Sequence, residues 1–329
     1  MSEGTSARRR KGQESNKPNG DKKEEKKPDR PRPFQGRYNP KYSDRYGVVS
    51  HKNVAKFVMG VGVVVFIVYS NYRRDHVHSM AKVSEVLDKK RHAQMQCAPS
   101  YKKEIQDLEP VCLPAKCGRF IVDDLVTLDE AHKLVALAKK GLSKGGGNGG
   151  ASILDLHSGA LSHGDNFINL YKTHPDLFTQ RDFETYRSIK DKVKAAVAEH
   201  FNLDNTKLYL SHPTFFSELT AVPASTIHDE YWHPHIDKET YPSFHYTSLL
   251  YLADYKRDFT GGRFVFIDDH QRANRTIEPK EGRVSAFTSG IENKHYVEPV
   301  SGGTRYALTM GFTCDKSKAI KDPGLEDKI

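Results

Sequence analysis

Residues 228–239, HDEYWHPHIDKE, concentrate side chains that can bind a metal. The stretch holds three histidines, four acidic residues and the only tryptophan of the chain. His235 and Asp237 are two residues apart, so their side chains lie on one face of the backbone if the segment is extended. Such a pair occurs by chance in many proteins, so it predicts a metal site only if a third ligand joins it.

His295 is the candidate for the third ligand, 58 residues after Asp237 and directly before the last predicted strand. Two histidines and one carboxylate form the facial triad of non-haem Fe(II) enzymes, which leaves positions on the metal open for a chelating co-substrate and O2. Arg305 follows ten residues later in GGTRYALTMGF. Its guanidinium could bind the far carboxylate of a dicarboxylate co-substrate, which favours His295 as a ligand over an ordinary histidine at a strand end.

The other residues of the opening stretch leave alternatives. His228 and Glu230 have the spacing of a second histidine–carboxylate pair. His233 would share a strand face with the two candidate ligands, so spacing alone leaves it open as a competing ligand. Otherwise we expect His233 near the metal or facing a substrate, with Tyr231 and Trp232 in the wall of the pocket.

The elements that must position these residues are mostly strands. From 207 to 315 the chain consists of short runs rich in Val, Ile, Thr, Tyr and Phe, separated by turn signals such as Gly302-Gly303. Short strands at this spacing predict an antiparallel sandwich or barrel. Residues 121–206 are expected to support it with helices, one after a capping box that starts at Thr127 and a second over 180–201. The expected fold class is mostly β with supporting helices (α+β).

Further motifs follow in the strand region: YTSLLYLADY (246–255), GGRFVF (261–266), PKEGRVSAF (279–287) and a histidine and an arginine separated by nine residues. Together with the His-x-Asp pair, this set resembles the prolyl 4-hydroxylase branch of the 2-oxoglutarate/Fe(II)-dependent dioxygenases. The resemblance implies a double-stranded β-helix (jelly-roll) catalytic domain over 207–315. It also implies a reaction in which 2-oxoglutarate, O2 and a substrate C–H give succinate, CO2 and a hydroxylated product.

The resemblance also implies roles for individual residues at the metal. His235, Asp237 and His295 match the Fe(2+) ligands of the family, which pairs the carboxylate with His235 rather than with His233. L-Ascorbate is implied as the reductant that keeps the iron in the ferrous state.

The co-substrate residues are implied in the same way. Arg305 matches the basic residue that pairs with the C5 carboxylate of 2-oxoglutarate. Tyr251 matches a tyrosine that hydrogen-bonds this carboxylate, although Tyr246 or Thr247 could take that role. Collagen-type prolyl hydroxylases carry lysine where Arg305 stands, and the two cations differ in geometry, which argues against assigning collagen as the substrate.

The N-terminal part of the chain differs from the rest in composition. Residues 1–56 hold 16 Lys and Arg against 7 Asp and Glu, which accounts for the net charge of +9 of the whole chain. We expect 1–53 to be a disordered basic tail, because it has few large apolar residues to bury. Residues 54–72 follow with a single charge, Lys56. As a helix they would span about 28 Å, enough for a transmembrane signal anchor, whereas a buried globular helix is the alternative.

The four cysteines all follow this span: Cys97, Cys112, Cys117 and Cys314. An even number on one side of a membrane segment predicts disulfides in an oxidising compartment. The pairing is not readable; the first three are the candidates for a bridge, and Cys314 is a candidate for an unpaired thiol. Zinc is disfavoured because only one closely spaced pair is present. Asn274 begins a glycosylation sequon, Asn-Arg-Thr, which fits the same side of the membrane.

The sequence therefore predicts a single-pass type II membrane protein of the secretory pathway, with its catalytic domain lumenal or extracellular. The expected segments are a tail (1–53), a signal anchor (54–72), a polar stem that could be helical (73–95), a Cys-rich segment (96–120), the helical support region (121–206), the jelly-roll (207–315) and a C-terminal tail (316–329).

The predicted function is a membrane-anchored dioxygenase that hydroxylates a side chain of a secretory-pathway protein. The alternative is a non-catalytic lumenal jelly-roll that binds a partner through the same pocket. A nucleic-acid partner is not expected, because basic and acidic residues balance after residue 56, with 35 of each. The sequence gives no indication of the oligomeric state.

Overall fold

The computed structural model describes residues 51–75, 77–268 and 273–325. Contacts divide the chain into two units, Met1–Gly62 and Val63–Ile329. Of the first unit only 51–62 are described, and they form the beginning of helix α1 (His51–Asp75). Almost all of the tail that we expect to be disordered thus lies outside the described residues.

Helix α1 contains the segment predicted to span a membrane. Its large apolar side chains are exposed, with Phe57 at 73% and Phe66 at 70%. Among the residues that the structure describes, no helix is at once long enough and apolar enough to cross a membrane.

The second unit is built on a large sheet of eleven strands. Nine of them follow one another across the sheet in this order: β2 (Arg91–Met95), β3 (Cys117–Val122), β13 (Val284–Thr288), β9 (Tyr246–Tyr251), β15 (Val300–Thr313), β8 (Tyr209–Thr220), β5 (Ala151–Leu154), β6 (Ala160–Gly164) and β4 (Gly146–Gly147). Two short strands pair at the side, β10 (Phe259–Gly261) with β15 and β7 (Asn166–Asn169) with β6.

A small sheet of four strands completes the β structure. Its order is β1 (Val77–Ala81), β12 (Asn274–Ile277), β11 (Phe264–Phe266) and β14 (His295–Val297). The two sheets are held together by a cluster of buried side chains from both, including Phe264 and Phe266 of β11 and Leu249 and Phe287 of the large sheet. This pairing confirms the prediction of a mostly β fold, and it is consistent with the expected jelly-roll.

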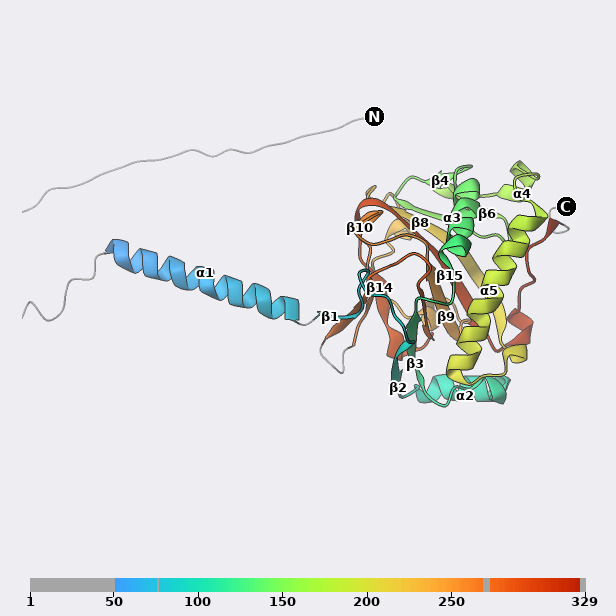
Figure 1. Ribbon diagram of the computed structural model, residues 1–329, viewed down its shortest axis with the longest axis horizontal. Helices are drawn as coiled ribbons and strands as arrows, with labels where there is room; N and C mark the ends of the chain where they lie inside the picture. Colours follow the sequence, from blue (N-terminus) through green and yellow to red (C-terminus); the bar gives the residue numbers. More distant parts are fainter. Residues whose placement is uncertain (1–50, 76, 269–272, 326–329) are drawn as a thin grey trace, which may run out of the picture. The chain divides into compact units, whose positions relative to one another are not determined.

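Helices cover the other face of the large sheet, where Figure 1 shows α3 (Leu128–Leu142) and α5 (Gln180–Phe201) side by side. Both predicted helices are thus confirmed, and the capping box at Thr127 forms with Glu130. An ion pair between Lys140 and Asp182, 2.9 Å long, ties the end of α3 to the start of α5. Leu308 and Met310 of β15 belong to the core under these helices, so Arg305, Ala307 and Thr309 of that strand face the small sheet.

The remaining helices are short: α2 (Pro99–Leu108), α4 (Leu170–Thr173), α6 (Asp237–Thr240), and the 3-10 turns η2 (Pro110–Cys112), η3 (Asn205–Lys207), η4 (Ile227–Asp229), η6 (Ile291–Asn293) and η7 (Lys316–Lys318).

The segment expected as a polar stem, 73–95, is helical only in its first residues, at the end of α1, and then contains strands. Its strand β1 pairs in parallel with β12 of the small sheet, and its strand β2 pairs with β3 of the large sheet. We call residues 77–95 the N-terminal strap. The strap thus contributes an edge strand to each sheet, so the folded unit begins before the Cys-rich segment.

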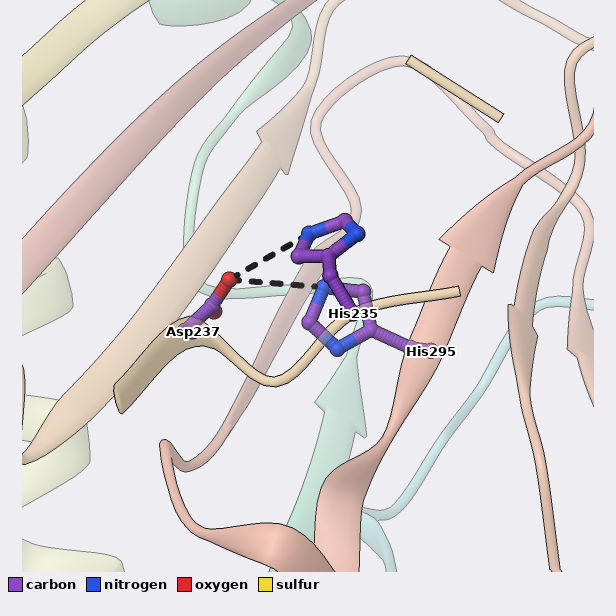
Figure 2. A group of neighbouring side chains, drawn as sticks. All are labelled: His235, Asp237 and His295. Carbon is purple, nitrogen blue, oxygen red and sulfur yellow. Dashed lines mark ion pairs between the residues drawn. The ribbon is translucent and has the colours of Figure 1, made fainter. Parts of the chain in front are cut away.

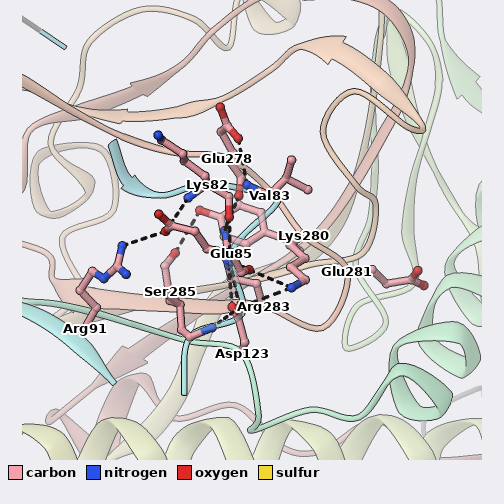
Figure 3. A network of polar contacts seen from close by, with 12 residues as sticks. Lys82, Val83, Glu85, Arg91, Asp123, Glu278, Lys280, Glu281, Arg283 and Ser285 are labelled. Atoms are coloured by element: carbon pink, nitrogen blue, oxygen red, sulfur yellow. Dashed lines mark hydrogen bonds and ion pairs between the residues drawn. The ribbon is translucent and has the colours of Figure 1, made fainter. Parts of the chain in front are cut away.

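Arg283 fastens the middle of the strap (Figure 3). Its side chain is fully buried, and its Nε and Nη2 donate to the carboxylate of Asp123 over 2.6 and 2.9 Å. The same guanidinium donates to the backbone carbonyls of Lys82 and Glu85 in the strap, each over 3.2 Å, and to that of Glu278 over 2.8 Å. One buried cation therefore connects the strap to the start of β13.

All four cysteines form disulfides, Cys97 with Cys117 and Cys112 with Cys314. The expectation of an unpaired Cys314 is therefore wrong. Sequence spacing could not reveal this pair, because the chain returns to Cys112 only after 202 residues, once β15 has been placed in the sheet.

Candidate metal and co-substrate site

The three predicted metal ligands meet between the sheets, as Figure 2 shows. Asp237 is the first residue of α6, His235 lies two residues before it, and His295 opens β14. The two histidines exchange backbone hydrogen bonds, His235 N–H to His295 O over 2.9 Å and the reverse over 3.0 Å. This single antiparallel bridge aligns segments that are far apart in the sequence.

One nitrogen of each histidine and one oxygen of Asp237 lie close enough together to bind a single metal ion. The Nε2 atoms of His235 and His295 lie 3.5 and 3.6 Å from Oδ1 of Asp237. The Nδ1 atoms face backbone carbonyls instead, that of His233 at 2.9 Å and that of Asn293 at 2.8 Å. Because a carbonyl only accepts, each Nδ1 carries the proton, and each Nε2 keeps its lone pair for a metal.

Burial and neighbours set the charge of the three side chains. Burial lowers the pKa of His235, but Asp237 and the His233 carbonyl outweigh it and raise this pKa above its usual range. Burial lowers the pKa of His295, which favours the neutral imidazole that binds a metal. Burial opposes the charge of Asp237, but the two histidines and a hydrogen bond from Thr247 outweigh it and hold the pKa of this carboxyl below its usual range. The Thr247 hydroxyl donates to Oδ2 over 2.6 Å, which leaves Oδ1 for the histidines.

The ligands open into a cavity of about 410 Å³ between the two sheets. Its wall is largely aliphatic and aromatic, with polar groups at the metal ligands, at Arg305 and at the rim near Glu230. The apolar wall includes Ile153, Phe215, Leu219, Tyr241, Phe244, Leu249, Phe264 and Val297.

Arg305 enters the same cavity from β15 and is 2% exposed. Its Nε donates to the carbonyl of Gly262 over 3.0 Å, and its buried Nη2 has no hydrogen-bond partner among the described residues. No carboxylate of the described residues acts on the Arg305 guanidinium, and burial lowers its pKa. A buried cation without an anion is costly, so the site is built for a ligand that brings one.

The tyrosine predicted beside Arg305 does not line the cavity. The Arg305 guanidinium lies 5.7 Å from the centre of the Tyr251 ring, but the Tyr251 hydroxyl is paired with Ser285 at 3.0 Å. The two alternatives are engaged elsewhere as well, since Tyr246 donates to the carbonyl of Cys112 and Thr247 holds Asp237. The hydroxyl of each of the three thus already has a partner other than Arg305.

The rest of the opening stretch surrounds the site without joining it. His233 pairs with Glu230 at 2.5 Å and is exposed, so its side chain stays outside the ligand group, while its carbonyl orients His235. Tyr231 lines the cavity as expected, whereas Trp232 is not among the lining residues. Asn274, the sequon residue, lies half-buried at the start of β12.

Some supporting residues have roles that the sequence does not indicate; it suggests Thr247 only as an alternative to Tyr251 at the co-substrate. Thr247, Asn293 and Gly262 each fix one functional side chain through a single hydroxyl or carbonyl. Threonines, asparagines and glycines in such positions are common in any sheet protein, so only the fold identifies them.

Comparisons with known proteins agree with this geometry. Residues 223–312 match the family model of the 2OG-Fe(II) oxygenase superfamily. The chain is 53% identical over 251 residues to 2-oxoglutarate and iron-dependent oxygenase domain-containing protein 3 of Xenopus tropicalis, an alignment that covers 73% of this chain and 78% of that protein. Prolyl 3-hydroxylase 1 of Rattus norvegicus is 26% identical over 221 residues, which cover 62% of this chain and 30% of that protein.

Among solved structures, a prolyl hydroxylase of Trichoplax adhaerens, in complex with a peptide of the hypoxia inducible factor oxygen degradation domain, is 17% identical with a TM-score of 0.42. It covers 61% of this chain and 84% of its own, and the likeness is too distant to add to the argument. The sequence relatives decide the family, and membership implies Fe(II) and 2-oxoglutarate as metal and co-substrate. The chain belongs to the 2OG-Fe(II) oxygenase superfamily.

Proposed function

We propose that this oxygenase is anchored in a membrane and hydroxylates a side chain of a secretory-pathway protein, with 2-oxoglutarate and O2 converted to succinate and CO2. The observation that carries the proposal is one cavity that contains both a His-Asp-His group and a buried arginine without an anion.

The donor set fits the metal and co-substrate of the family. His235, Asp237 and His295 would hold Fe(II), which supplies the oxidative chemistry when bound. Arg305 would pair with the distal carboxylate of 2-oxoglutarate, because its buried Nη2 lacks a partner among the described residues. The apolar wall would exclude water from the cavity and orient an uncharged group of the substrate toward the metal ligands.

A protein side chain is the proposed substrate. Prolyl 3-hydroxylase 1, by its name, acts on prolyl residues, and it shares sequence with 62% of this chain. The aliphatic and aromatic cavity wall supports an uncharged side chain, since a charged group would lose its hydration without a partner. L-Ascorbate is proposed as the reductant, as is typical for the family.

The secretory pathway is supported by the covalent structure. Two disulfides in one folded unit are typical of an oxidising compartment. Residues 54–72, with one charge, are proposed as the anchor, and Asn274 as a glycosylated residue on the lumenal side. The apolar side chains of α1 are exposed in this chain, which leaves them available to lipid.

The test of the activity is succinate release by the purified full chain, given Fe(II), 2-oxoglutarate, ascorbate and a panel of secretory-pathway peptides. We expect turnover that Asp237→Ala abolishes. Asp124→Ala, which removes an exposed carboxylate outside the cavity wall, should retain it. A wild-type chain that binds neither Fe(II) nor 2-oxoglutarate would contradict the proposal. Asp237→Ala can then serve to trap a substrate, whose hydroxylated peptide gains the mass of one oxygen atom.

The topology has its own test. We expect the C-terminus to be protected from protease in intact microsomes, and an endoglycosidase to shift the mobility of the wild type but not of Asn274→Gln. Digestion of the C-terminus in sealed microsomes would contradict lumenal placement and leave the enzymatic proposal standing.

A further inference from the structure

Tyr231 approaches the Arg305 end of the cavity from the loop between β8 and α6. Its hydroxyl oxygen accepts a hydrogen bond from the backbone N–H of Val300, 2.9 Å long. In the described part of the chain, no acceptor lies within hydrogen-bond distance of this hydroxyl for its own proton. A tyrosine hydroxyl can accept and donate at once, so one donor remains available.

Val300 and Arg305 meet at one glycine. A Cβ built on Gly262 would lie 3.0 Å from Val300 Cγ2 and 3.1 Å from Arg305 Cδ, and its carbonyl accepts from Arg305 Nε. Gly262 therefore lies beside both Val300, the hydrogen-bond partner of Tyr231, and the side chain of Arg305. This places the Tyr231 hydroxyl and the guanidinium at the same end of the cavity, which both residues line.

The Arg305 guanidinium and the Tyr231 hydroxyl each have a hydrogen-bond donor without an acceptor among the described residues. Arg305 is a buried cation with an unpartnered Nη2, and Tyr231 has a hydroxyl proton without an acceptor among the described residues. Burial raises the pKa of Tyr231, so its hydroxyl stays protonated and can donate at neutral pH. A carboxylate accepts several hydrogen bonds and would satisfy both.

The other tyrosine beside Arg305 is less suited to this role. The Tyr251 hydroxyl is already paired with Ser285, its side chain is fully buried, and it is absent from the cavity wall. The Tyr251 hydroxyl could accept from Ser285 and still donate, but Tyr251 does not line the cavity that a ligand would occupy.

We infer that Tyr231 is a further co-substrate residue of this oxygenase, whose hydroxyl donates a hydrogen bond to the distal carboxylate that Arg305 binds. The inference rests on the proposed pairing of Arg305 with 2-oxoglutarate. Because Tyr231 lies on the loop that carries His235 and leads into α6, bound 2-oxoglutarate would hold this loop against the start of β15. Affinity for the co-substrate would then depend on a residue four positions before His235.

Calorimetry on the full chain tests the inference without turnover. The protein is loaded with Mn(II) in the absence of O2 and titrated with 2-oxoglutarate or with 2-oxopentanoate, which lacks the distal carboxylate. We expect Tyr231→Phe to weaken 2-oxoglutarate binding by about ten- to hundredfold, the effect of one hydrogen bond to a charged group. Binding of 2-oxopentanoate should change little.

Matched variants make the result specific. Tyr255→Phe removes the hydroxyl of another tyrosine packed on the same apolar cluster but outside the cavity wall, and it should bind both ligands as the wild type does. Equal affinity of Tyr231→Phe and wild type for 2-oxoglutarate would overturn the inference. So would equal weakening toward both ligands, which means a structural role, or a selective loss confined to Tyr251→Phe. A wild type that does not distinguish the two ligands would instead overturn the proposed role of Arg305 together with the inference.

Discussion

At the scale of single residues, the two carboxylate oxygens of Asp237 have different partners. Its Oδ2 accepts from Thr247, and its Oδ1 faces both histidines. Thr247 is buried, and its hydroxyl also contacts Ser289 at 2.8 Å, so it cannot turn away freely. Groups of this kind orient a ligand and typically change metal affinity by one to two orders of magnitude.

Thr247→Val should therefore weaken Fe(II) binding by about ten- to hundredfold. Valine keeps the branched shape but cannot donate to Asp237. Metal binding measured by competition with a chelator checks this prediction. Thr247→Ser, which keeps the hydroxyl, is the control, and an unchanged affinity in the valine variant would mean that α6 alone positions the carboxylate.

His245 is a second residue whose protonation is fixed by its neighbours. Its Nδ1 accepts the backbone N–H of Cys314 at 3.0 Å, and its Nε2 donates to Glu104 at 3.1 Å. The ring is completely buried, and burial together with Lys238 lowers the pKa of His245 to about 4. Protonation would place a second N–H against that of Cys314, so the folded state requires the neutral ring.

The pH dependence of stability follows with a definite sign. In the unfolded chain the histidine titrates near its ordinary pKa of about 6.5. Below that pH the unfolded state binds more protons than the folded state, so the free energy of unfolding falls as the pH drops from about 6.5 to about 4, by about 3 kcal/mol in total. His245→Asn should be less stable at pH 7.5 but should lose less stability over this range. Urea unfolding at several pH values measures both, and parallel curves for the two proteins would contradict the assignment.

At the scale of elements, the N-terminal strap is part of the catalytic unit. It adds β1 to the small sheet, whose strand β14 carries His295, and it adds β2 to the large sheet. Arg283, paired with Asp123, holds the part of the strap between these two strands through the carbonyls of Lys82 and Glu85. Removal of one partner of a buried ion pair leaves an unpaired charge in the interior, which is more costly than the removal of both.

We expect Arg283→Met to lower the free energy of unfolding by about 3 to 5 kcal/mol. Hydrogen exchange should show the loss of protection first in β1 and β12, since the strap carbonyls lose their donor. Asp123→Leu combined with Arg283→Met removes both charges and should recover part of the loss. A double variant as unstable as the sum of the single variants would mean that the carbonyl hydrogen bonds, rather than the charge, decide the stability.

At the scale of the whole molecule, two disulfides close loops of different size. Cys97–Cys117 spans 20 residues, whereas Cys112–Cys314 spans 202 and joins η2 to the end of β15. In the chain-entropy model the stabilisation grows with the logarithm of the loop length, so the long bridge should contribute about 2 kcal/mol more than the short one.

Replacement of each pair by alanine compares the two bridges. We expect the variant without Cys112–Cys314 to have the lower midpoint of urea unfolding. Mild reduction of the wild type should lower the midpoint further, toward that of a protein without either bridge. The opposite order of the two midpoints would show that local packing around the short bridge outweighs loop entropy.

The sequence by itself determined the residue types of the site and the kind of secondary structure in each region. Few sites other than one for iron and a dicarboxylate combine the residue types of His235, Asp237, His295 and Arg305. Their order along the chain can be read without a structure. The helices over 128–142 and 180–201 were predictable because capping boxes and apolar periodicity act locally. So was the β character of the later region, which depends on residue type and turn signals.

Only the tertiary structure decided what depends on contacts across long stretches of chain. The bridge aligns His235 with His295, and the pairing of His233 with Glu230 leaves His233 out of the ligand group, a choice that spacing left open. The pairing of Cys112 with Cys314, the strap strands and the separate positions of Tyr251 and Tyr231 around Arg305 share the same origin. Strand registers and sheet order are set by packing between distant segments, and a local sequence pattern carries no information about which hydroxyl, carbonyl or thiol a distant strand will bring alongside.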